Sequence, residues 1–200
     1  MYSNGKLFWT QQYRKMKHSS LTCSCFESKF IVTSPIGDIK IVSCSEGLHS
    51  VSFSNDDSLQ ITPDKHIPVL AKSNSSNITE CSPAEKCYQW LKNFFSLRKA
   101  DPDIPPLCQF VMKPDTFCSK VLQCLPAAAP FGTTISYKDL AHLCGNVKAS
   151  RAVGHAMSSN PFILIIPCHR VICSNGEVGN YAKGRRNTVK QWLHNFEKES

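Results

Sequence analysis

The sequence predicts an α+β protein with two unlike halves joined by a proline-rich segment. In the first half, short runs rich in β-branched residues flank Pro/Gly turns, which is typical of an antiparallel sheet. In the second half, apolar residues recur at helical spacing. The intervening residues 101–114 are rich in proline, which neither a helix nor a central strand tolerates well. We therefore expect a small N-terminal α/β domain over residues 29–100, a linker over 101–114 and a mostly helical C-terminal domain over 115–200.

The first half is expected to form an antiparallel sheet covered by one helix. Residues 30–33 and 39–43 flank a Ser-Pro-Ile-Gly-Asp turn and predict a β-hairpin, and residues 48–53 alternate apolar and polar positions as a third strand would. Residues 55–79 are polar and are expected to form a loop. Residues 83–97 place their apolar side chains on one helical face, and Ser82 is suited to cap the start of that helix.

The second half is expected to contain a helix-turn-helix. Three helices are predicted, over residues 115–125, 136–143 and 148–158. The first is expected to be broken by residues 126–132, which begin with a proline. Ser136 and Asp139 resemble a capping box that opens the second helix. A Gly-Asn turn at residues 145–146 then joins the second helix to the third, and two helices joined by a tight Gly-containing turn match a helix-turn-helix.

The composition bears on location and partners. The net charge of +8 favours a polyanionic partner such as nucleic acid, although an acidic protein or an anionic membrane would also suit it. The first acidic residue is Glu27, so residues 1–28 are expected to be a basic, partly disordered arm, with a mitochondrial presequence as the alternative. This arm lacks the apolar core of a signal peptide, so the 11 cysteines are expected to be reduced. No apolar run approaches the roughly 20 residues of a membrane span.

The sequence indicates a reactive cysteine at the end of a buried segment. Residues 162–166 are continuously apolar and largely β-branched, which predicts a buried strand. Cys168 and His169 follow almost directly, and Arg170 comes next. The thiolate is the nucleophilic form of cysteine, and an adjacent imidazole or guanidinium lowers the pKa of the thiol. The alternative is that Cys168 is a buried core residue and His169 lies at the surface.

Five segments of the second half share the order and nearly the spacing of one known family. They are residues 166–171 (IPCHRV), 131–141, 145–161, 179–181 and 190–197. Together they resemble the O6-alkylguanine-DNA alkyltransferases, also called methylated-DNA–protein-cysteine methyltransferases. The resemblance implies that the N-terminal domain is ribonuclease H-like and that the C-terminal domain carries a winged helix-turn-helix-like DNA-binding element.

The resemblance implies a single-use repair reaction on double-stranded DNA. Cys168 would accept the alkyl group of O6-alkylguanine, and more weakly that of O4-alkylthymine. Glu197 would orient His169, which would take the thiol proton through a water, and Asn160 would tie the recognition helix to the active-site strand. Because nothing in the motif supplies a second nucleophile to cleave the thioether, each molecule is expected to act once.

The resemblance also implies how DNA is held. The second helix of the helix-turn-helix would enter the minor groove while the damaged nucleotide is flipped out, with low sequence selectivity. Its many small residues suit a close approach to DNA, although they would equally serve tight helix packing. Arg151 would fill the gap left by the base, and Tyr137 would push the nucleotide out. Contacts with the DNA backbone are implied for Lys138, Asn146 and Ser174. The walls of the substrate pocket are implied to include Val171, Tyr181 and Ala182.

Three positions depart from the family pattern. His155 replaces a glycine, Ile163 replaces a proline that some members have, and residues 183–187 are longer and more basic than the usual Gly-Gly-containing stretch. These departures bear on the size of adduct that the pocket accepts and leave the basic reaction in place.

A structural zinc site is a second hypothesis. Cysteine and histidine residues here are irregularly spaced, which by itself is a weak zinc signal that scattered reduced cysteines would also explain. Some animal members of the family bind zinc through two cysteines and two histidines, and the resemblance places the ligands at Cys25, Cys44, His49 and Cys108. Cys108 replaces a histidine, and because thiolate is an equally good ligand a Cys3His site is preserved. Cys23 is the alternative to Cys25.

Other functions fit parts of the sequence less well. A non-catalytic damage-binding protein would not need the acceptor Cys168. A metal-binding module would use Cys168, His169 and Cys173, but adjacent cysteine and histidine are poorly spaced for one tetrahedral ion. A cysteine hydrolase would need a further signature that the chain lacks. We therefore expect a monomeric DNA-repair transferase without an organic cofactor or a membrane partner, located in the nucleus or alternatively in the mitochondrion.

Overall fold

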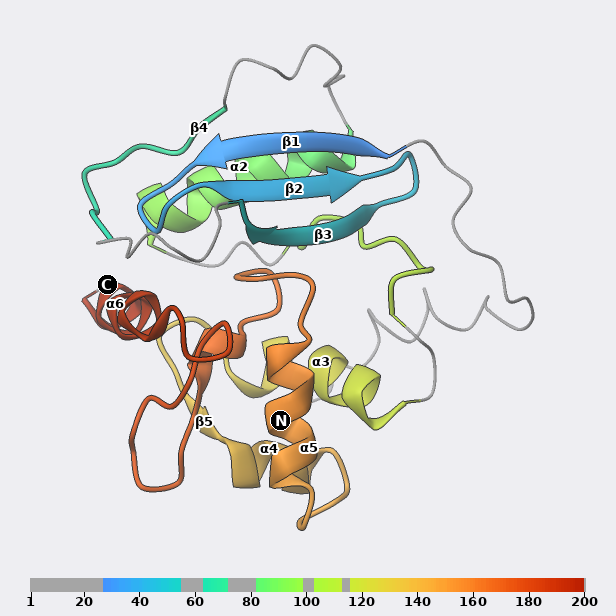
Figure 1. Ribbon diagram of the computed structural model, residues 1–200, viewed down its shortest axis with the longest axis vertical. Coiled ribbons are helices and arrows are strands. Elements are labelled where there is room, and N and C mark those ends of the chain that lie inside the picture. Colours follow the sequence, from blue (N-terminus) through green and yellow to red (C-terminus); the bar gives the residue numbers. More distant parts are fainter. Residues whose placement is uncertain (1–26, 55–62, 72–81, 99–102, 113–115, 200) are drawn as a thin grey trace.

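The computed structural model describes residues 27–54, 63–71, 82–98, 103–112 and 116–199, and the expected basic arm lies almost entirely outside them. A small sheet and one helix form the upper layer of the molecule, and a cluster of helices lies below it, as Figure 1 shows. The predicted α+β class is confirmed.

The sheet is antiparallel, with strand order β3-β2-β1-β4. Its strands are β1 (Ser28–Thr33), β2 (Ile39–Ser43), β3 (Leu48–Phe53) and β4 (Leu70–Ala71). Strands β2 and β3 match the predicted bounds, and β1 begins two residues before the predicted start; alternation and a Pro/Gly turn predict all three because they are local signals. The two-residue β4 is a correction, since it lies within residues 55–79, where a loop was expected; residues 55–62 and 72–79 of that stretch lie outside the described residues.

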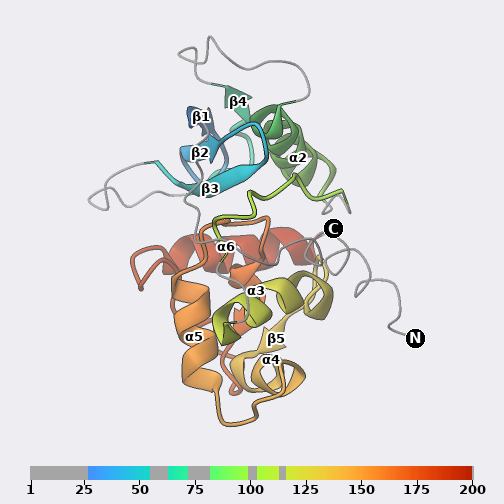
Figure 2. The same cartoon turned by 90° about the vertical axis from the view of Figure 1, so that its right-hand side faces the viewer.

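Helix α2 (Pro83–Leu97) covers one face of the sheet (Figure 2). Ser82 caps it as predicted, because its Oγ accepts a hydrogen bond from the Glu85 amide at 3.1 Å. Its buried face supplies an aromatic cluster centred on Phe94. The Phe94 ring lies 5.6 Å from that of Phe131 and 6.0 Å from that of Phe196, both in the lower layer. Aromatic packing therefore joins the two layers into one core.

The lower layer contains most of the helices. Its elements are α3 (Phe117–Ala128), β5 (Ile135–Ser136), α4 (Tyr137–Leu143), α5 (Ser150–Ser158), the 3₁₀ helix η1 (Cys168–Arg170), β6 (Val171–Ile172) and α6 (Asn187–Lys198). β5 and β6 form a parallel pair. Ser136 opens α4 as predicted, and its Oγ accepts from the Asp139 amide at 3.0 Å. Gly145, in the turn before α5, has a φ of +86°, a conformation that glycine adopts without strain.

Two predicted helix boundaries were wrong. Helix α3 was expected to end at Leu125, but it continues through Pro126 to Ala128. Pro126 has no amide to donate to the Leu122 carbonyl, but the helix continues past it, since the Ala129 amide still donates to the Leu125 carbonyl at 2.9 Å. Helix α5 begins at Ser150 and not at residue 148, because the Ala149 amide donates to the Asn146 carbonyl and closes the preceding turn.

The predicted strand over residues 162–166 is also wrong. The segment is buried, but it forms a series of turns: the Ile166 amide donates to the Phe162 carbonyl at 2.9 Å, and the Cys168 amide donates to the Ile166 carbonyl at 2.8 Å. Leu164 has a φ of +67°, which no strand permits. A continuous apolar run signals burial on all sides, and a buried turn satisfies that signal as well as a strand does.

The free edge of β3 joins the layers through backbone hydrogen bonds. The Leu48 amide donates to the Pro106 carbonyl at 2.7 Å, within the expected linker. Farther along the strand, the Val51 amide donates to the Pro161 carbonyl at 2.8 Å, and the Ile163 amide donates to the Val51 carbonyl at 3.0 Å. The segment that leads to Cys168 is therefore fastened to the sheet, and it runs beside β3 in Figure 1.

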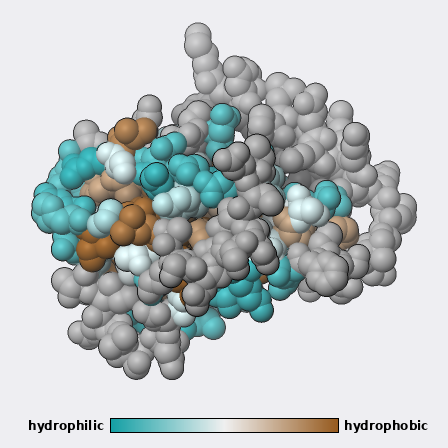
Figure 3. Space-filling view, turned by 90° about the horizontal axis from the view of Figure 1, so that it is seen from above, coloured by the Kyte–Doolittle hydropathy of each residue, from teal (hydrophilic) through white to brown (hydrophobic). Residues whose placement is uncertain are grey.

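Among the described residues, no helix is long and apolar enough to span a bilayer. Figure 3 shows that hydrophobic residues on the face seen from above are interspersed with hydrophilic ones.

We predict that Gly47→Ala destabilises the protein by roughly 1–3 kcal/mol, as overpacking typically does. A Cβ atom at Gly47 would lie 2.5 Å from the Cys108 amide nitrogen and 2.8 Å from the Pro106 carbonyl oxygen, both backbone atoms that cannot rotate away. Urea unfolding measures the loss. The matched control is Gly154→Ala, in helix α5 with nothing within 4 Å, where helix propensity gains up to about 1 kcal/mol. Unchanged stability of Gly47→Ala would show that residues 106–108 do not pack against this turn.

Candidate functional site

Cys168 opens the 3₁₀ helix η1 at the end of the buried turns, and it is 5% exposed. The side chain of Asn160 holds this position. Its Nδ2 donates to the Cys168 Sγ at 3.1 Å and to the Ile166 carbonyl at 2.8 Å, while its Oδ1 accepts from the Phe162 amide at 2.9 Å. One amide thus connects the end of α5, the turns and the thiol.

The environment of the Cys168 thiol combines opposing effects. Burial raises the pKa of Cys168, whereas the hydrogen bond from Asn160, the positive charge of Lys190 and the nearby hydroxyl of Tyr181 lower it. The Tyr181 hydroxyl is buried and has no hydrogen-bond partner of standard geometry within the described residues. The net effect of burial favours the neutral thiol, so a group that accepts the thiol proton would promote nucleophilic attack.

A buried carboxylate lies at the centre of the neighbouring network. Glu197 accepts from His169 Nε2 at 2.7 Å and from the Arg170 guanidinium at 2.9–3.2 Å, and it also accepts from the Gly132 amide at 3.1 Å. Arg170 donates in addition to the Ala129 carbonyl at 2.9 Å. These partners outweigh the burial that would raise the pKa of Glu197, and they lower it to about 2. The carboxylate is therefore ionised and fully hydrogen-bonded.

Burial sets the protonation state of His169, and Glu197 determines which ring nitrogen carries the proton. Burial lowers the pKa of His169 to about 4, so its imidazole is neutral at pH 7. Because the acceptor Glu197 faces Nε2, the ring proton resides on that nitrogen, and Nδ1 carries the free lone pair. Nδ1 is buried without a hydrogen-bond partner among the described residues. His169 is thus prepared to accept a proton, but no direct hydrogen bond between its ring and the Cys168 thiol is found in the described structure.

Lys190 is a contributor that the sequence analysis did not single out. It is fully buried in α6, and its Nζ donates to the Val171 carbonyl at 2.7 Å and to the Asn180 carbonyl at 3.4 Å. Burial lowers the pKa of Lys190 to about 8, which leaves most of its charge in place at neutral pH. Lys190 and Glu197 are seven residues apart, on one helical face with Leu193. In the sequence, Lys190 and Glu197 are charged residues within the apolar stripe of this helix, and that pattern could have indicated a role for both.

The residues expected to form the pocket are Val171, Tyr181 and Ala182, of which the first two are buried and the third is half-buried. Val171 is fully buried in β6, and Tyr181 is 5% exposed. Tyr137, at the start of α4, is half-buried, and its ring centroid lies 5.8 Å from Lys190 Nζ. Burial raises the pKa of Tyr137, so its hydroxyl stays protonated.

The residues expected to contact DNA lie outside this buried cluster. Each has an exposed side chain on a helix start or a turn: Lys138 in α4, Asn146 before α5, Arg151 in the first turn of α5, and Ser174 in the turn after β6. Arg151, His155 and Ser158 are all exposed and share one face of α5, while Val153 and Ala156 are buried on the opposite face. The small residues of α5 therefore serve helix packing in part.

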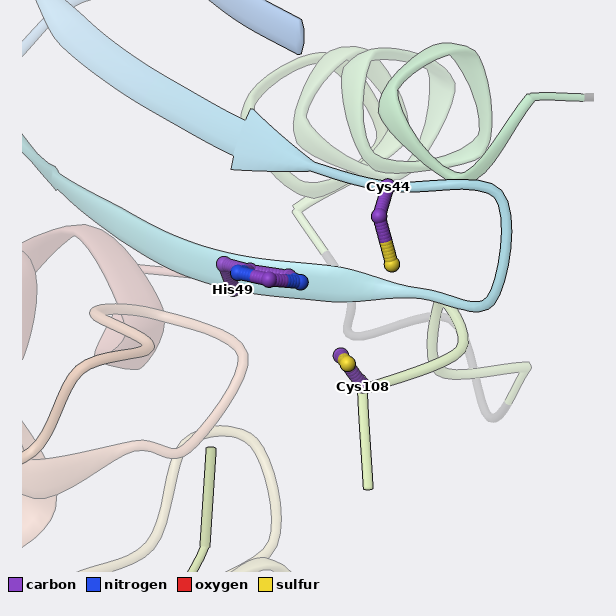
Figure 4. Close-up of side chains that lie close together, drawn as sticks. All are labelled: Cys44, His49 and Cys108. Atoms are coloured by element: carbon purple, nitrogen blue, oxygen red, sulfur yellow. The ribbon is translucent and has the colours of Figure 1, made fainter. Parts of the chain in front are cut away.

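A separate cluster of possible metal ligands lies at the sheet edge. The ligand atoms of Cys44, His49 and Cys108 all lie within 4.8 Å of one another, as Figure 4 shows. His49 Nδ1 is hydrogen-bonded to the Glu27 carboxylate at 3.0 Å, and its Nε2 is buried without a partner among the described residues. Cys25 and the alternative Cys23 lie outside the described residues. Three of the four expected ligands therefore converge.

Residues 116–199 match the family described as 6-O-methylguanine DNA methyltransferase, DNA binding domain. Curated relatives named methylated-DNA–protein-cysteine methyltransferase include the Cricetulus griseus protein, 37% identical over 85% of this chain and 81% of its own, and the Homo sapiens protein, 35% identical over 84% and 79%. A crystal structure of Mycobacterium tuberculosis OGT in complex with DNA superposes with a TM-score of 0.62, at 25% identity, over 84% of this chain and 91% of that chain.

We predict that Lys190→Met slows alkylation of Cys168 by iodoacetamide and moves the midpoint of its pH dependence upward. The buried ammonium group stabilises the Cys168 thiolate, so its removal raises the pKa of the thiol. Peptide mass spectrometry separates Cys168 from the other cysteines. Lys198→Met, an exposed change on the same helix, is the control and should leave the profile unchanged. Identical profiles for both variants, with folding verified by circular dichroism, would contradict this role.

Proposed function

Because the chain belongs to the methylated-DNA–protein-cysteine methyltransferase family, we propose that Cys168 is the residue that receives the alkyl group. The protein repairs DNA by direct reversal, since it transfers an alkyl group from the damaged base to one of its own cysteines. The observation that carries the assignment of Cys168 is its hydrogen bond from Asn160, next to the ionised Glu197 and neutral His169.

The proposed reaction is a single displacement. His169 Nδ1 takes the Cys168 proton through a bridging water, Sγ attacks the alkyl carbon of O6-alkylguanine, and the bond between that carbon and the guanine oxygen breaks. The electron pair stays with the guanine, which takes up a proton and is restored. Glu197 keeps the His169 ring oriented and stabilises the imidazolium that forms. The thioether on Cys168 is permanent, so each molecule reacts once, and O4-alkylthymine is the weaker substrate.

The proposed DNA complex requires the damaged nucleotide to leave the duplex. Cys168 is 5% exposed, so an alkyl group inside stacked DNA could not reach its sulfur. In this proposal α5 enters the minor groove, Arg151 occupies the gap in the stack, and Tyr137 displaces the nucleotide toward Val171, Tyr181 and the Ala182 amide. Exposed Lys138, Asn146 and Ser174 would hold the DNA backbone. Contacts of these kinds carry little base information, so we expect low sequence selectivity.

In the same proposal, each half of the chain has a specific fold. The N-terminal sheet with α2 would be a ribonuclease H-like domain, and α4, α5 and the turn after β6 would form a winged helix-turn-helix-like element, with domain boundaries as expected from the sequence. The exposed turn at Ser174, closed by the hydrogen bond from the Cys173 amide to the Glu177 carbonyl at 2.8 Å, supports the wing. We expect a monomer that works in the nucleus, with the mitochondrion as the alternative.

A structural zinc ion is proposed at Cys44, His49 and Cys108, with Cys25 as the fourth ligand. Two features of the described residues fit zinc. The unpaired Nε2 of His49 is available as a ligand, while Glu27 holds Nδ1, an arrangement common among zinc-bound histidines. Ligand atoms within 4.8 Å need only a small contraction toward the spacing of about 3.8 Å between sulfurs of a tetrahedral site. The ion would cross-link β2, β3 and the linker, apart from the reaction.

We predict that the mass of the protein rises by one CH₂ group after incubation with an oligonucleotide that carries O6-methylguanine. The gain should saturate at one per chain and map to Cys168, because the thioether has no route to hydrolysis. Intact-mass and peptide mass spectrometry measure it. Cys168→Ser should abolish the gain, and Cys124→Ala, in helix α3, should retain it. Transfer that survives Cys168→Ser, or turnover beyond one equivalent, would refute the mechanism.

We predict about one zinc per chain in protein purified without chelator. Cys108→Ser should reduce the zinc content and lower the unfolding temperature, since structural zinc contributes directly to folding free energy. Alkyl transfer to Cys168 should persist in the folded variant. Elemental analysis and thermal unfolding are the measurements, with Cys124→Ala as the control. Wild-type protein containing far less than one zinc per chain would overturn the metal hypothesis and leave the transfer reaction unaffected.

A further inference from the structure

The loop between Tyr181 and helix α6 carries two exposed cations that the proposed reaction does not use. They are Lys183 and Arg185, and residues 181–187 contain no acidic side chain. Tyr181 is buried beside the Cys168 thiol, so the loop begins in the wall of the pocket. Lys183 lies only two residues farther along the chain. Its charge is therefore near the entrance through which a nucleotide would reach Cys168.

The loop has an unusual backbone. Ala182, Lys183 and Gly184 have φ values of 47°, 59° and 86°, which places three consecutive residues in the left-handed region. Hydrogen bonds from the Gly184 amide at 3.0 Å and the Arg186 amide at 3.2 Å to the Tyr181 carbonyl close this turn. The left-handed conformation is strained for any residue other than glycine, because its Cβ crowds the following carbonyl oxygen. Such strain persists where the surroundings impose it, and it is frequent at functional sites.

Both ends of the loop are fixed. The Tyr181 amide donates to Asn187 Oδ1 at 2.9 Å. The Arg186 guanidinium is buried and lies 4.2 Å from the centre of the Phe53 ring, which in turn packs edge-on against Tyr181. The backbone between these anchors directs Lys183 outward, and within the described part of the chain Lys183 has no hydrogen bond or ion pair. A preordered cation without a protein partner suits an external anion.

We propose that Lys183, supported by Arg185, binds a backbone phosphate next to the flipped nucleotide. This inference rests on the proposed function, because it needs a nucleotide in the pocket beside Tyr181. The phosphates of that nucleotide must remain outside the pocket, and Lys183 and Arg185 are exposed two and four residues after Tyr181 in its wall. Lysine binds phosphate as a point charge and needs no precise geometry. The loop would thus hold the flipped state electrostatically while its buried end shapes the pocket.

The test separates charge from backbone conformation. Lys183→Gln removes the charge and keeps the left-handed strain, whereas Lys183→Gly removes both. In a Cys168→Ser background, which prevents the reaction, fluorescence anisotropy gives the affinity for a short duplex with one O6-methylguanine over a NaCl series. Each lost phosphate contact should decrease the magnitude of the negative slope of log affinity against log salt by about 0.9. We expect that decrease equally for both variants, and a decrease of about twice that size for the Lys183→Gln/Arg185→Gln double variant.

Two controls make the result specific. Lys86→Gln, an equal charge change on the exposed side of α2, should leave the salt slope unchanged. With Cys168 intact, Lys183→Gln should react normally with the O6-methylguanine nucleoside, which has no phosphate. An unchanged slope in both Lys183 variants, or a matching loss of reaction with the nucleoside, would overturn the inference. Failure of the wild type to transfer the alkyl group from duplex and nucleoside alike would instead overturn the proposed function.

Discussion

The site depends on the hydrogen bonds that the ionised carboxylate of Glu197 accepts. Glu197 is 5% exposed, and a buried charge of this kind is tolerated only with strong partners. Arg170 supplies the opposite charge, and the Gly132 amide and the His169 ring supply further donors. Through these bonds one side chain on the last helix fixes the 3₁₀ helix that carries Cys168, the loop before β5, and the proton position on His169. Removing it would leave a buried guanidinium unpaired and the imidazole unoriented.

The upper layer contributes to the site through backbone pairing. Val51 of β3 donates its amide to the Pro161 carbonyl and accepts at its carbonyl from the Ile163 amide. Asn160 begins that segment and holds the thiol. The placement of the sulfur therefore depends on a strand more than 100 residues earlier in the chain. Aromatic packing of Phe94 against Phe131 and Phe196 reinforces the same alignment.

Local patterns predicted local structure well. Strands β1 to β3, helix α2 with its Ser82 cap, and the start of α4 at Ser136 all follow from signals within a few residues. The buried turns before Cys168 could not be distinguished from a strand, because an apolar run records burial and not the left-handed φ of Leu164. The β5–β6 pair was not predicted, since partners far apart in sequence define it. Helix α6 was not predicted either, although buried residues recur along it at helical spacing.

The residues of the site divide in the same way: some were predictable from the nearby sequence, and others depend on contacts between segments far apart in the chain. The motif around Cys168 was visible in the sequence, but the role of Lys190 became evident only from its burial against Val171 and Asn180. Arg170 was noted as a neighbour of the thiol, whereas the structure pairs it with Glu197, 27 residues away. Cys44, His49 and Cys108 have no regular spacing, and they converge because Leu48 pairs with the linker.

The hydrogen bonds along the β3 edge can form only in a fixed order during synthesis of the chain. Residues 48–53 leave the ribosome well before residues 106–108, and much earlier still than residues 161–163, which cover the rest of the same strand edge. Until then the nascent sheet presents unpaired amides and carbonyls that could pair with another chain. The protein is therefore most exposed to misassembly while the portion that covers this edge is still being translated.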